Sequence, residues 1–210
     1  VVQSLIVMEQ AGLLSCEDAV ATKDWFSNYL YWLANHPYGK DEMNAKNNHG
    51  TCWVMQAAQF AKYTGNREVL DFCRERYQTV LLPGQMDTDG SFPLELARTK
   101  PYGYSLFNLD AMATVCHILS DDTNNLWQYT TKDGRNMQKG VAWLCPYIKD
   151  KSAWPCEKDV MYWDEWPVAH AALLFSVCDT PDEDYFSLWS ELEHFPENDE
   201  VIRNFPLRHP

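Results

Sequence analysis

The stretch AKNNHGTCWVMQAAQFAKYTGN, residues 45–66, decides the fold class that the sequence predicts. Helical patterning runs over residues 51–63 and begins again after the asparagine that closes the stretch. Between the two runs, Gly65 suits the left-handed residue that ends a helix, and Asn66 suits the N-cap of the next helix. The stretch therefore predicts two helices joined by a short turn, which is a helix hairpin.

Helical patterning continues along most of the chain. In residues 25–36, four large apolar side chains share one helical face, namely Trp25, Tyr29, Trp32 and Leu33. We expect helices at roughly 2–14, 17–35, 51–63, 66–82, 105–119, 134–148, 166–178 and 184–193. Residues 82–93 are rich in Pro, Gly and Asp and predict a loop, and no segment has the alternation of a strand. The prediction is an all-α fold of stacked antiparallel helix hairpins, an α/α toroid or an arc of one, whose loops at one end line a cleft.

Composition narrows the function classes. With 210 residues and 46% hydrophobic residues, the chain can form one packed domain. Aromatic residues reach 14%, which serves either a core or flat surfaces that stack on sugars or bases. A net charge of −13 without a Lys/Arg cluster argues against nucleic acid and anionic membranes as partners. It also opposes a polyanionic substrate, unless basic groups such as Lys46, Arg98 and Lys100 gather in one cleft.

The cysteine pattern and the chain start bear on cellular location. Seven cysteines are present, and their spacings match no zinc site. A disulfide between Cys145 and Cys156 would close a loop, and the odd total leaves at least one thiol unpaired or paired outside the chain. The first residues read as a helix already under way, with no signal peptide and no apolar run of transmembrane length. We predict a secreted protein and a processed or partial chain.

Two amides and an imidazole precede the helix of the opening stretch. Unpaired N–H groups and a partial positive charge at a helix N-terminus attract carboxylates, and the amide of Asn48 adds a donor there. The imidazole of His49 can exchange a proton near neutral pH. The alternative is that Asn48 is only an N-cap and His49 a surface residue.

Residues 87–112 carry a second group of candidates. Glu95 and Arg98 are three residues apart and can pair if the segment is helical, which would orient the guanidinium. Tyr102 and Tyr104 follow, and a phenol near an arginine can serve as a proton donor or acceptor. The alternative is a surface salt bridge beside two packing tyrosines.

Residues 161–170, MYWDEWPVAH, form a third candidate. The rings of Trp163 and Trp166 can stack on pyranose rings, and the carboxylates of Asp164 and Glu165 can bind hydroxyls. As a glycosidase acid/base pair the two carboxylates are poorly placed, because adjacent residues on a helix diverge by about 100°. The alternative is an aromatic core with a solvated acidic turn.

Taken together, NNHGT (47–51) and DGSFPLELARTKPYGYSLFNLDAM (89–112) resemble the alginate lyase superfamily of polysaccharide lyases, which have an α/α toroid fold. The resemblance implies that residues 1–210 are a single helical domain forming an incomplete toroid. Catalytic domains of this family extend further on the N-terminal side, so the chain looks like their C-terminal portion. A separate N-terminal portion of the same precursor is then an expected partner.

The resemblance also implies roles for particular residues. Asn48 matches the asparagine that neutralises the substrate carboxylate, and His49 matches the catalytic histidine. Arg98 matches the arginine of the site, and Tyr104 the catalytic tyrosine, with Tyr102 as second choice. We expect further substrate contacts from Asn47, Lys100, Tyr102, Trp163, Glu165 and Trp166.

The reaction implied is β-elimination in a polymer of 4-O-linked uronic acid, with no metal and no organic cofactor. Stabilising the charge that develops on the carboxylate makes the C5 proton removable, and an acid protonates the departing C4 oxygen. Tyr104 would do both in mannuronate, where the two groups share a face, and His49 would be the base in guluronate. Mannuronate-rich alginate is the first expected substrate and glucuronan the second. The alternatives are a non-catalytic carbohydrate-binding protein and a toroid glycoside hydrolase that uses Asp164 or Glu165.

Overall fold

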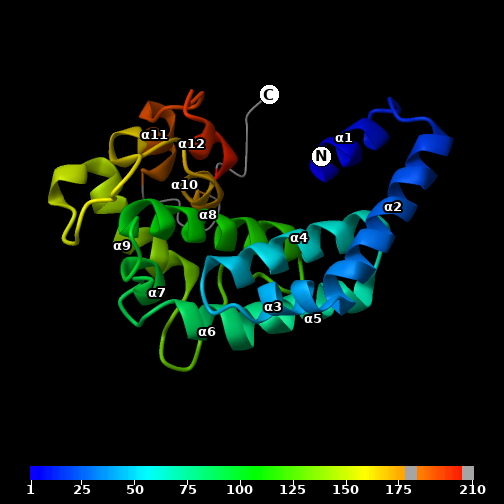
Figure 1. Ribbon diagram of the computed structural model, residues 1–210, viewed down its shortest axis with the longest axis horizontal. Coiled ribbons are helices and arrows are strands. Elements are labelled where there is room, and N and C mark those ends of the chain that lie inside the picture. Colours follow the sequence, from blue (N-terminus) through cyan, green and yellow to red (C-terminus); the bar gives the residue numbers. More distant parts are fainter. Residues whose placement is uncertain (178–183, 205–210) are drawn as a thin grey trace.

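The computed structural model describes residues 1–177 and 184–204, and within these ranges the chain is helical without a strand (Figure 1). The all-α prediction is confirmed. No helix in the described part of the chain is long and apolar enough to cross a membrane. The helices are α1 (Val2–Gln10), α2 (Cys16–Asn35), α3 (Pro37–Asn44), α4 (Asn48–Thr64), α5 (Arg67–Arg76), η1 (Tyr77–Leu81), α6 (Leu82–Gln85), α7 (Pro93–Leu96), α8 (Pro101–Leu119), α9 (Met137–Lys149), η2 (Lys151–Ala153), η3 (Trp163–Glu165), α10 (Ala171–Ser176), α11 (Tyr185–Glu191) and α12 (Asp199–Arg203).

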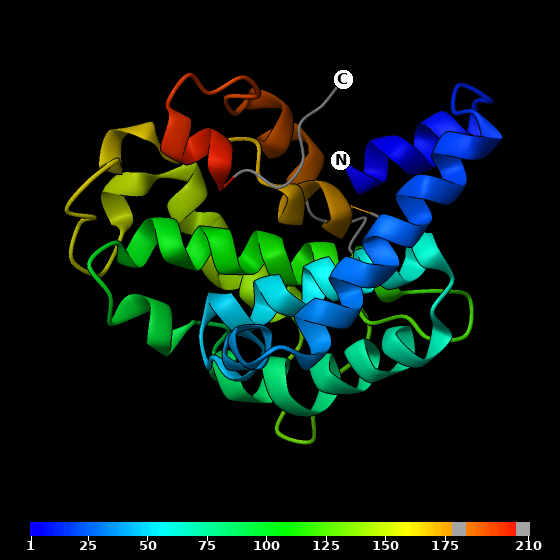
Figure 2. The same ribbon diagram turned by 45° about the vertical axis from the view of Figure 1, so that its right-hand side comes forward.

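Helices α4 and α8 run side by side in the same direction through the middle of the molecule (Figures 1 and 2). Near their N-terminal ends, Asn48 of α4 donates to Glu95 of α7, the short helix before α8. Near their C-terminal ends, Lys62 donates to the carbonyl of Ile118 at 3.0 Å. Helix α5 follows α4 and helix α9 follows α8, and each runs back along the outside of this central pair. This arrangement of stacked hairpins is the predicted one.

The hairpin of α4 and α5 forms at the glycine and asparagine that the sequence predicted for its turn. Gly65 ends α4 with a left-handed φ of 76°, which only glycine adopts at low cost. Asn66 accepts the N–H of Val69 and caps α5. A tight turn of this kind makes α4 and α5 antiparallel neighbours.

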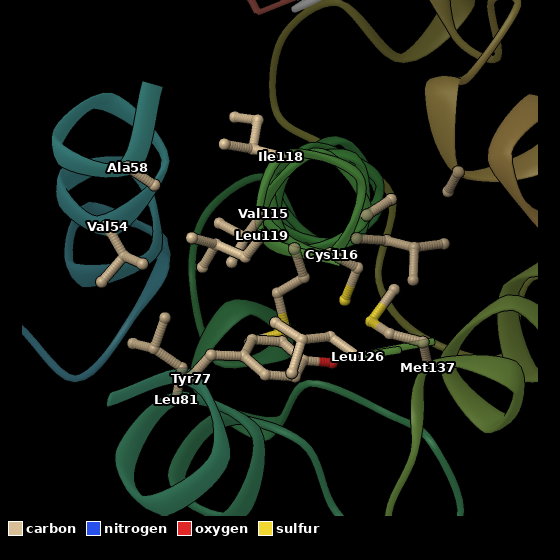
Figure 3. Packing of buried hydrophobic residues seen from close by; sticks show 14 of the residues in the cluster. Val54, Ala58, Tyr77, Leu81, Val115, Cys116, Ile118, Leu119, Leu126 and Met137 are labelled. Carbon is tan, nitrogen blue, oxygen red and sulfur yellow. The ribbon is translucent and has the colours of Figure 1, made fainter. Parts of the chain in front are cut away.

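Helix α8 is buried along almost its whole length, because the helices on either side cover it. Its residues 102–119 include only a few that are partly exposed. Figure 3 shows α8 end-on, with apolar side chains filling the space between it and the helices α4, η1 and α9. The labelled members of this cluster are Val54, Ala58, Tyr77, Leu81, Val115, Cys116, Ile118, Leu119, Leu126 and Met137.

Several helix boundaries differ from the predicted ones. Helix α4 begins at Asn48 rather than Thr51, and α8 begins at Pro101 because proline fits the first helical position. The predicted helix 66–82 is three consecutive elements that reach Gln85, inside the predicted loop. The predicted helix 166–178 is wrong at its start, since only Ala171–Ser176 is helical and residue 178 lies outside the described residues.

Two further predictions are corrected. Helix α3 was not expected, although His36 accepts the N–H of Tyr38 and caps it. The disulfide between Cys145 and Cys156 is absent: Cys156 is an exposed thiol and Cys145 a buried side chain.

Candidate active site

The N-terminal ends of α4 and α8 open on one pocket with a volume of about 560 Å³. Asn48, His49, Arg98 and Tyr104, which the sequence analysis proposed from two separate stretches, all line this pocket. Helices α2 and α3 form the opposite wall. The remaining lining residues are Tyr29, Trp32, Leu33, Tyr38, Gly39, Glu42, Cys52, Trp53, Gln56, Phe107 and Asn204.

The two asparagines before α4 have different tasks. Asn47 is the N-cap, and its side-chain oxygen accepts the N–H of His49 at 3.3 Å. The Asn47 carbonyl accepts from Gln85 Nε2 at 3.0 Å, so this residue fixes the start of the helix and is not among the pocket lining. The alternative reading of Asn48 as the N-cap is therefore wrong. Asn48 is the first helical residue, and its buried amide is available for another task.

The buried carboxylate of Glu95 joins the two halves of the site. It accepts the backbone N–H of Asn48 at 2.7 Å and the Asn48 side-chain amide at 2.8 Å. It also pairs with Arg98 Nη1 at 3.2 Å, as the three-residue spacing predicted. Burial raises the pKa of Glu95, and the hydrogen bonds from Asn48 and Arg98 oppose that rise.

Arg98 in turn holds the candidate tyrosine. Its guanidinium carbon lies 3.6 Å from the centre of the Tyr104 ring, a stacked cation–π contact. The guanidinium therefore lies over the face of the ring, between Glu95 and Tyr104, and fixes the ring's orientation. Asn48, Glu95, Arg98 and Tyr104 form one continuous chain of contacts.

His49 reaches the pocket from the first turn of α4. Its Nδ1 lies 2.8 Å from the Glu42 carboxylate on α3, and its side chain is 51% exposed. A carboxylate on one ring nitrogen fixes the tautomer and leaves the other nitrogen for exchange with a ligand. Cys52, one turn along α4, is no nucleophile here, because burial raises the pKa of its thiol to about 12.

Lys100 lies at the edge of the site rather than in the pocket lining. Its ammonium pairs with Glu200 of α12 at 3.0 Å and lies 4.9 Å from the centre of the Tyr104 ring. Through this pair, α12 packs against the start of α8 and brings Asn204 into the pocket. Lys46, also proposed as a source of positive charge, is an exposed residue on the surface.

Four other predicted substrate-binding residues lie away from the pocket. Tyr102 is fully buried, its hydroxyl donates to the Tyr147 carbonyl at 2.9 Å, and burial raises the pKa of its phenol. Trp166 is buried in the core. Trp163 packs against Tyr102 instead, and Glu165 is exposed on η3 outside the pocket. None of the four side chains lines the pocket, and their contact with a substrate stays a prediction.

Sequence reasoning missed the part that α2, α3 and α12 have in the pocket. Tyr29 and Trp32 come from the helical face recognised on residues 25–36, so their shared face was the signal that pointed to them. For Glu42 and Asn204 no local pattern exists, because their role depends on how separate helices pack. Among the described residues, no three His, Cys, Asp or Glu side chains gather as they would around a metal ion.

The arrangement can hold an anion and move a proton. The side-chain amide of Asn48 and the guanidinium of Arg98 line the same pocket, and such donors bind a carboxylate and stabilise charge that grows on it. A phenol and an imidazole stand in the same pocket as proton-transfer groups.

Comparison with known proteins identifies the family. The family model described as alginate lyase matches residues 1–154. The chain belongs to the alginate lyase family. A crystal structure of an alginate lyase from Bacteroides ovatus has a similar fold, with a TM-score of 0.80 and 29% sequence identity. The match covers 99% of this chain and 55% of that one, so this chain spans about half of that protein. A search of the curated proteins gives no match.

Proposed function

We propose that this protein is a polysaccharide lyase that cleaves a 4-O-linked uronic-acid polymer by β-elimination, with mannuronate-rich alginate as the preferred substrate. The observation that carries the proposal is the shared pocket at the N-termini of α4 and α8, lined by Asn48, His49, Arg98 and Tyr104. Membership in the alginate lyase family supports the reaction class.

In the proposed reaction, the substrate carboxylate binds at the Asn48 amide and the guanidinium of Arg98. These donors stabilise the enolate that forms when the C5 proton leaves, which is the step that needs the most help because a charged carboxylate barely acidifies that proton. The electron pair of the broken C–H bond forms the C4–C5 double bond, and the bond between C4 and its glycosidic oxygen breaks. A proton transferred to that oxygen completes the elimination.

For mannuronate, the phenolate of Tyr104 takes the C5 proton, and the phenol so formed gives that proton to the leaving oxygen, since both groups lie on one face of the sugar. For guluronate, His49 is the base from the opposite face. The contact between His49 and Glu42 stabilises the imidazolium that results. No step calls for a metal or an organic cofactor. Since such polymers lie outside cells, we also propose that the protein is secreted, which its recovery from the culture medium would test.

The direct test is the ultraviolet absorbance of the 4,5-unsaturated uronate product. The complete protein is incubated in parallel with polymannuronate, polyguluronate and glucuronan, and we expect the fastest rise with polymannuronate. The Tyr104→Phe variant should lose at least about 100-fold in kcat, the usual contribution of a general acid–base group, while still binding the polymer. Tyr102→Phe is the matched control, because it removes the phenol two residues away that faces the core. Near-normal turnover in Tyr104→Phe would show that another group transfers the proton.

A second candidate function is carbohydrate binding without catalysis. The aromatic wall of Tyr29, Trp32, Tyr38 and Phe107 favours it, because flat rings stack on sugars whether or not a bond is cut. Binding of polymannuronate in calorimetry without any unsaturated product would decide for this function. The glycoside hydrolase alternative has no support from the geometry, since Asp164 and Glu165 are exposed side chains outside the pocket.

A further inference from the structure

We infer that Glu95 is a positioning residue of this site: its buried carboxylate sets the Asn48 amide and the Arg98 guanidinium in the orientation that receives a substrate carboxylate. The inference rests on the proposed function and adds to it a residue that touches no substrate. Glu95 lies on α7, which is 47 residues from Asn48 along the chain.

Burial and contact geometry single out this carboxylate. Glu95 is 1% exposed, so it neither faces the pocket nor exchanges with water. Its two oxygens accept hydrogen bonds from three donors, namely the Asn48 N–H at 2.7 Å, the Asn48 amide at 2.8 Å and Arg98 Nη1 at 3.2 Å. A carboxyl group whose partners are all donors can only accept hydrogen bonds, and the form that only accepts is the ionised carboxylate.

The contact to the Asn48 side chain determines which way its amide points. One of the two amide hydrogens is held by Glu95, so the plane of the amide is fixed and the second hydrogen has a single direction. Without this contact, the amide could turn and present its oxygen to the substrate carboxylate, which would repel it. Glu95 therefore decides whether Asn48 is a donor at the place where charge develops.

The contact to Arg98 extends the control to the tyrosine. With one nitrogen of its guanidinium held by Glu95, Arg98 lies flat over the Tyr104 ring at 3.6 Å. The same carboxylate thus orders a carboxylate-binding group and, through Arg98, the ring of the proposed acid–base group. Placement errors near 1 Å at such groups cost about 100-fold in rate.

A glutamine at this position has nearly the same shape but the wrong chemistry. Its NH2 group would take the place of one oxygen: in one orientation the Asn48 N–H loses its acceptor, and in the other the Asn48 amide and Arg98 both lose theirs. We expect Glu95→Gln to lower kcat by about 100-fold with a smaller change in KM. Glu95→Asp keeps the charge on a side chain one methylene shorter and should recover part of the lost kcat.

The experiment compares kcat and KM on polymannuronate for the complete wild-type protein and for Glu95→Gln, Glu95→Asp, Asn48→Ala and the double variant Glu95→Gln/Asn48→Ala. If Glu95 acts in part through Asn48, the loss of kcat in the double variant is smaller than the product of the two single losses. A loss equal to that product would mean that the two residues act independently and would overturn the inference. Wild-type kcat in both Glu95→Gln and Glu95→Asp would also overturn it.

The control for a merely structural effect is Asp110→Asn. Asp110 is another buried carboxylate, which holds His170 Nδ1 at 2.8 Å and the Ala172 N–H at 2.9 Å, outside the pocket. We expect this change to lower the melting temperature and to leave kcat per folded molecule unchanged. If Glu95→Gln does not fold, Glu95→Asp carries the test, and wild-type kcat in that variant overturns the inference.

A wild-type protein that yields no unsaturated product would refute the proposed function rather than the role of Glu95. Calorimetric binding of a mannuronate oligosaccharide then decides. Tenfold weaker binding by Glu95→Gln than by the wild type supports the positioning role, and equal affinity refutes it.

Discussion

The start of α8, which carries Tyr104, depends on a single buried carboxylate from a distant loop. Lys100 is the N-cap of α8 but makes no side-chain cap. Asp159 replaces it: one oxygen accepts the Tyr102 N–H at 2.8 Å and the other accepts the Gly103 N–H at 2.8 Å. We predict that removing these acceptors destabilises the protein.

The magnitude follows from the number of donors left without a partner. Asp159→Asn keeps one acceptor and leaves one buried N–H unpaired, which costs about 1–3 kcal/mol of unfolding free energy. Asp159→Ala leaves two unpaired and should cost about twice as much. At roughly 2–4 °C per kcal/mol for a chain of this size, the Asn variant should melt about 2–12 °C lower and the Ala variant lower still.

Thermal unfolding followed by circular dichroism at neutral pH measures both shifts. Asp164→Asn is the control, because this carboxylate is exposed on the same loop and should change the unfolding free energy by less than about 0.5 kcal/mol. Melting temperatures of both Asp159 variants equal to that of the control would refute the capping role. An Asn variant less stable than the Ala variant would refute the counting of donors.

The two other predictions concern a close approach and a turn. A methyl group on Gly103 would lie 2.8 Å from Asp159 Oδ2. The Gly103→Ala variant should therefore lose about 1–3 kcal/mol of unfolding free energy and form product more slowly. The Gly84→Ala control has open space around the new methyl group and should be equally or slightly more stable in the same thermal melt. Asp121 has its pKa lowered from 3.8 to about 2, first of all by the hydroxyl of the threonine two residues on. Because the folded-state value is the lower one, its contribution to stability is present above pH 3.8 and is lost as the pH falls through about 2. Acid titrations should therefore show a weaker loss of stability over this range in Asp121→Asn, while Asp122→Asn keeps the wild-type slope; an unchanged slope in Asp121→Asn would contradict the reasoning.

The sequence predicted those features that depend only on residues close together in the chain. Gly65 and Asn66 end one helix and start the next wherever they occur in this context, so the hairpin was readable. The pairing of Glu95 with Arg98 follows from a spacing of three residues and was also readable. Neither depends on the rest of the chain.

The choice between the two tyrosines was not readable in the same way. Tyr102 and Tyr104 both lie in the first turn of α8 and differ by about 200° around the helix, so only one can face the pocket. An amphipathic helix would have shown which, but α8 is buried nearly all round and has no polar stripe. Tertiary packing decides here: Tyr102 meets Trp154 and the Tyr147 carbonyl, which leaves Tyr104 for the pocket.

The strongly acidic composition also has a different meaning once the contacts are known. A net charge of −13 counted against a polyanionic substrate, yet three acids in or beside the pocket each have a cationic or imidazole partner. Glu42 pairs with an imidazole at 2.8 Å, Glu95 with Arg98 at 3.2 Å, and Glu200 with an ammonium at 3.0 Å. An approaching carboxylate then meets the Asn48 amide and the Arg98 guanidinium, whose effect is short-ranged and strongest inside the pocket. Repulsion from distant surface acids is screened by salt over about 8–10 Å. Pairing of charges at the site, which no count along the sequence gives, thus reconciles the acidic composition with the anionic polymer that we propose as the substrate.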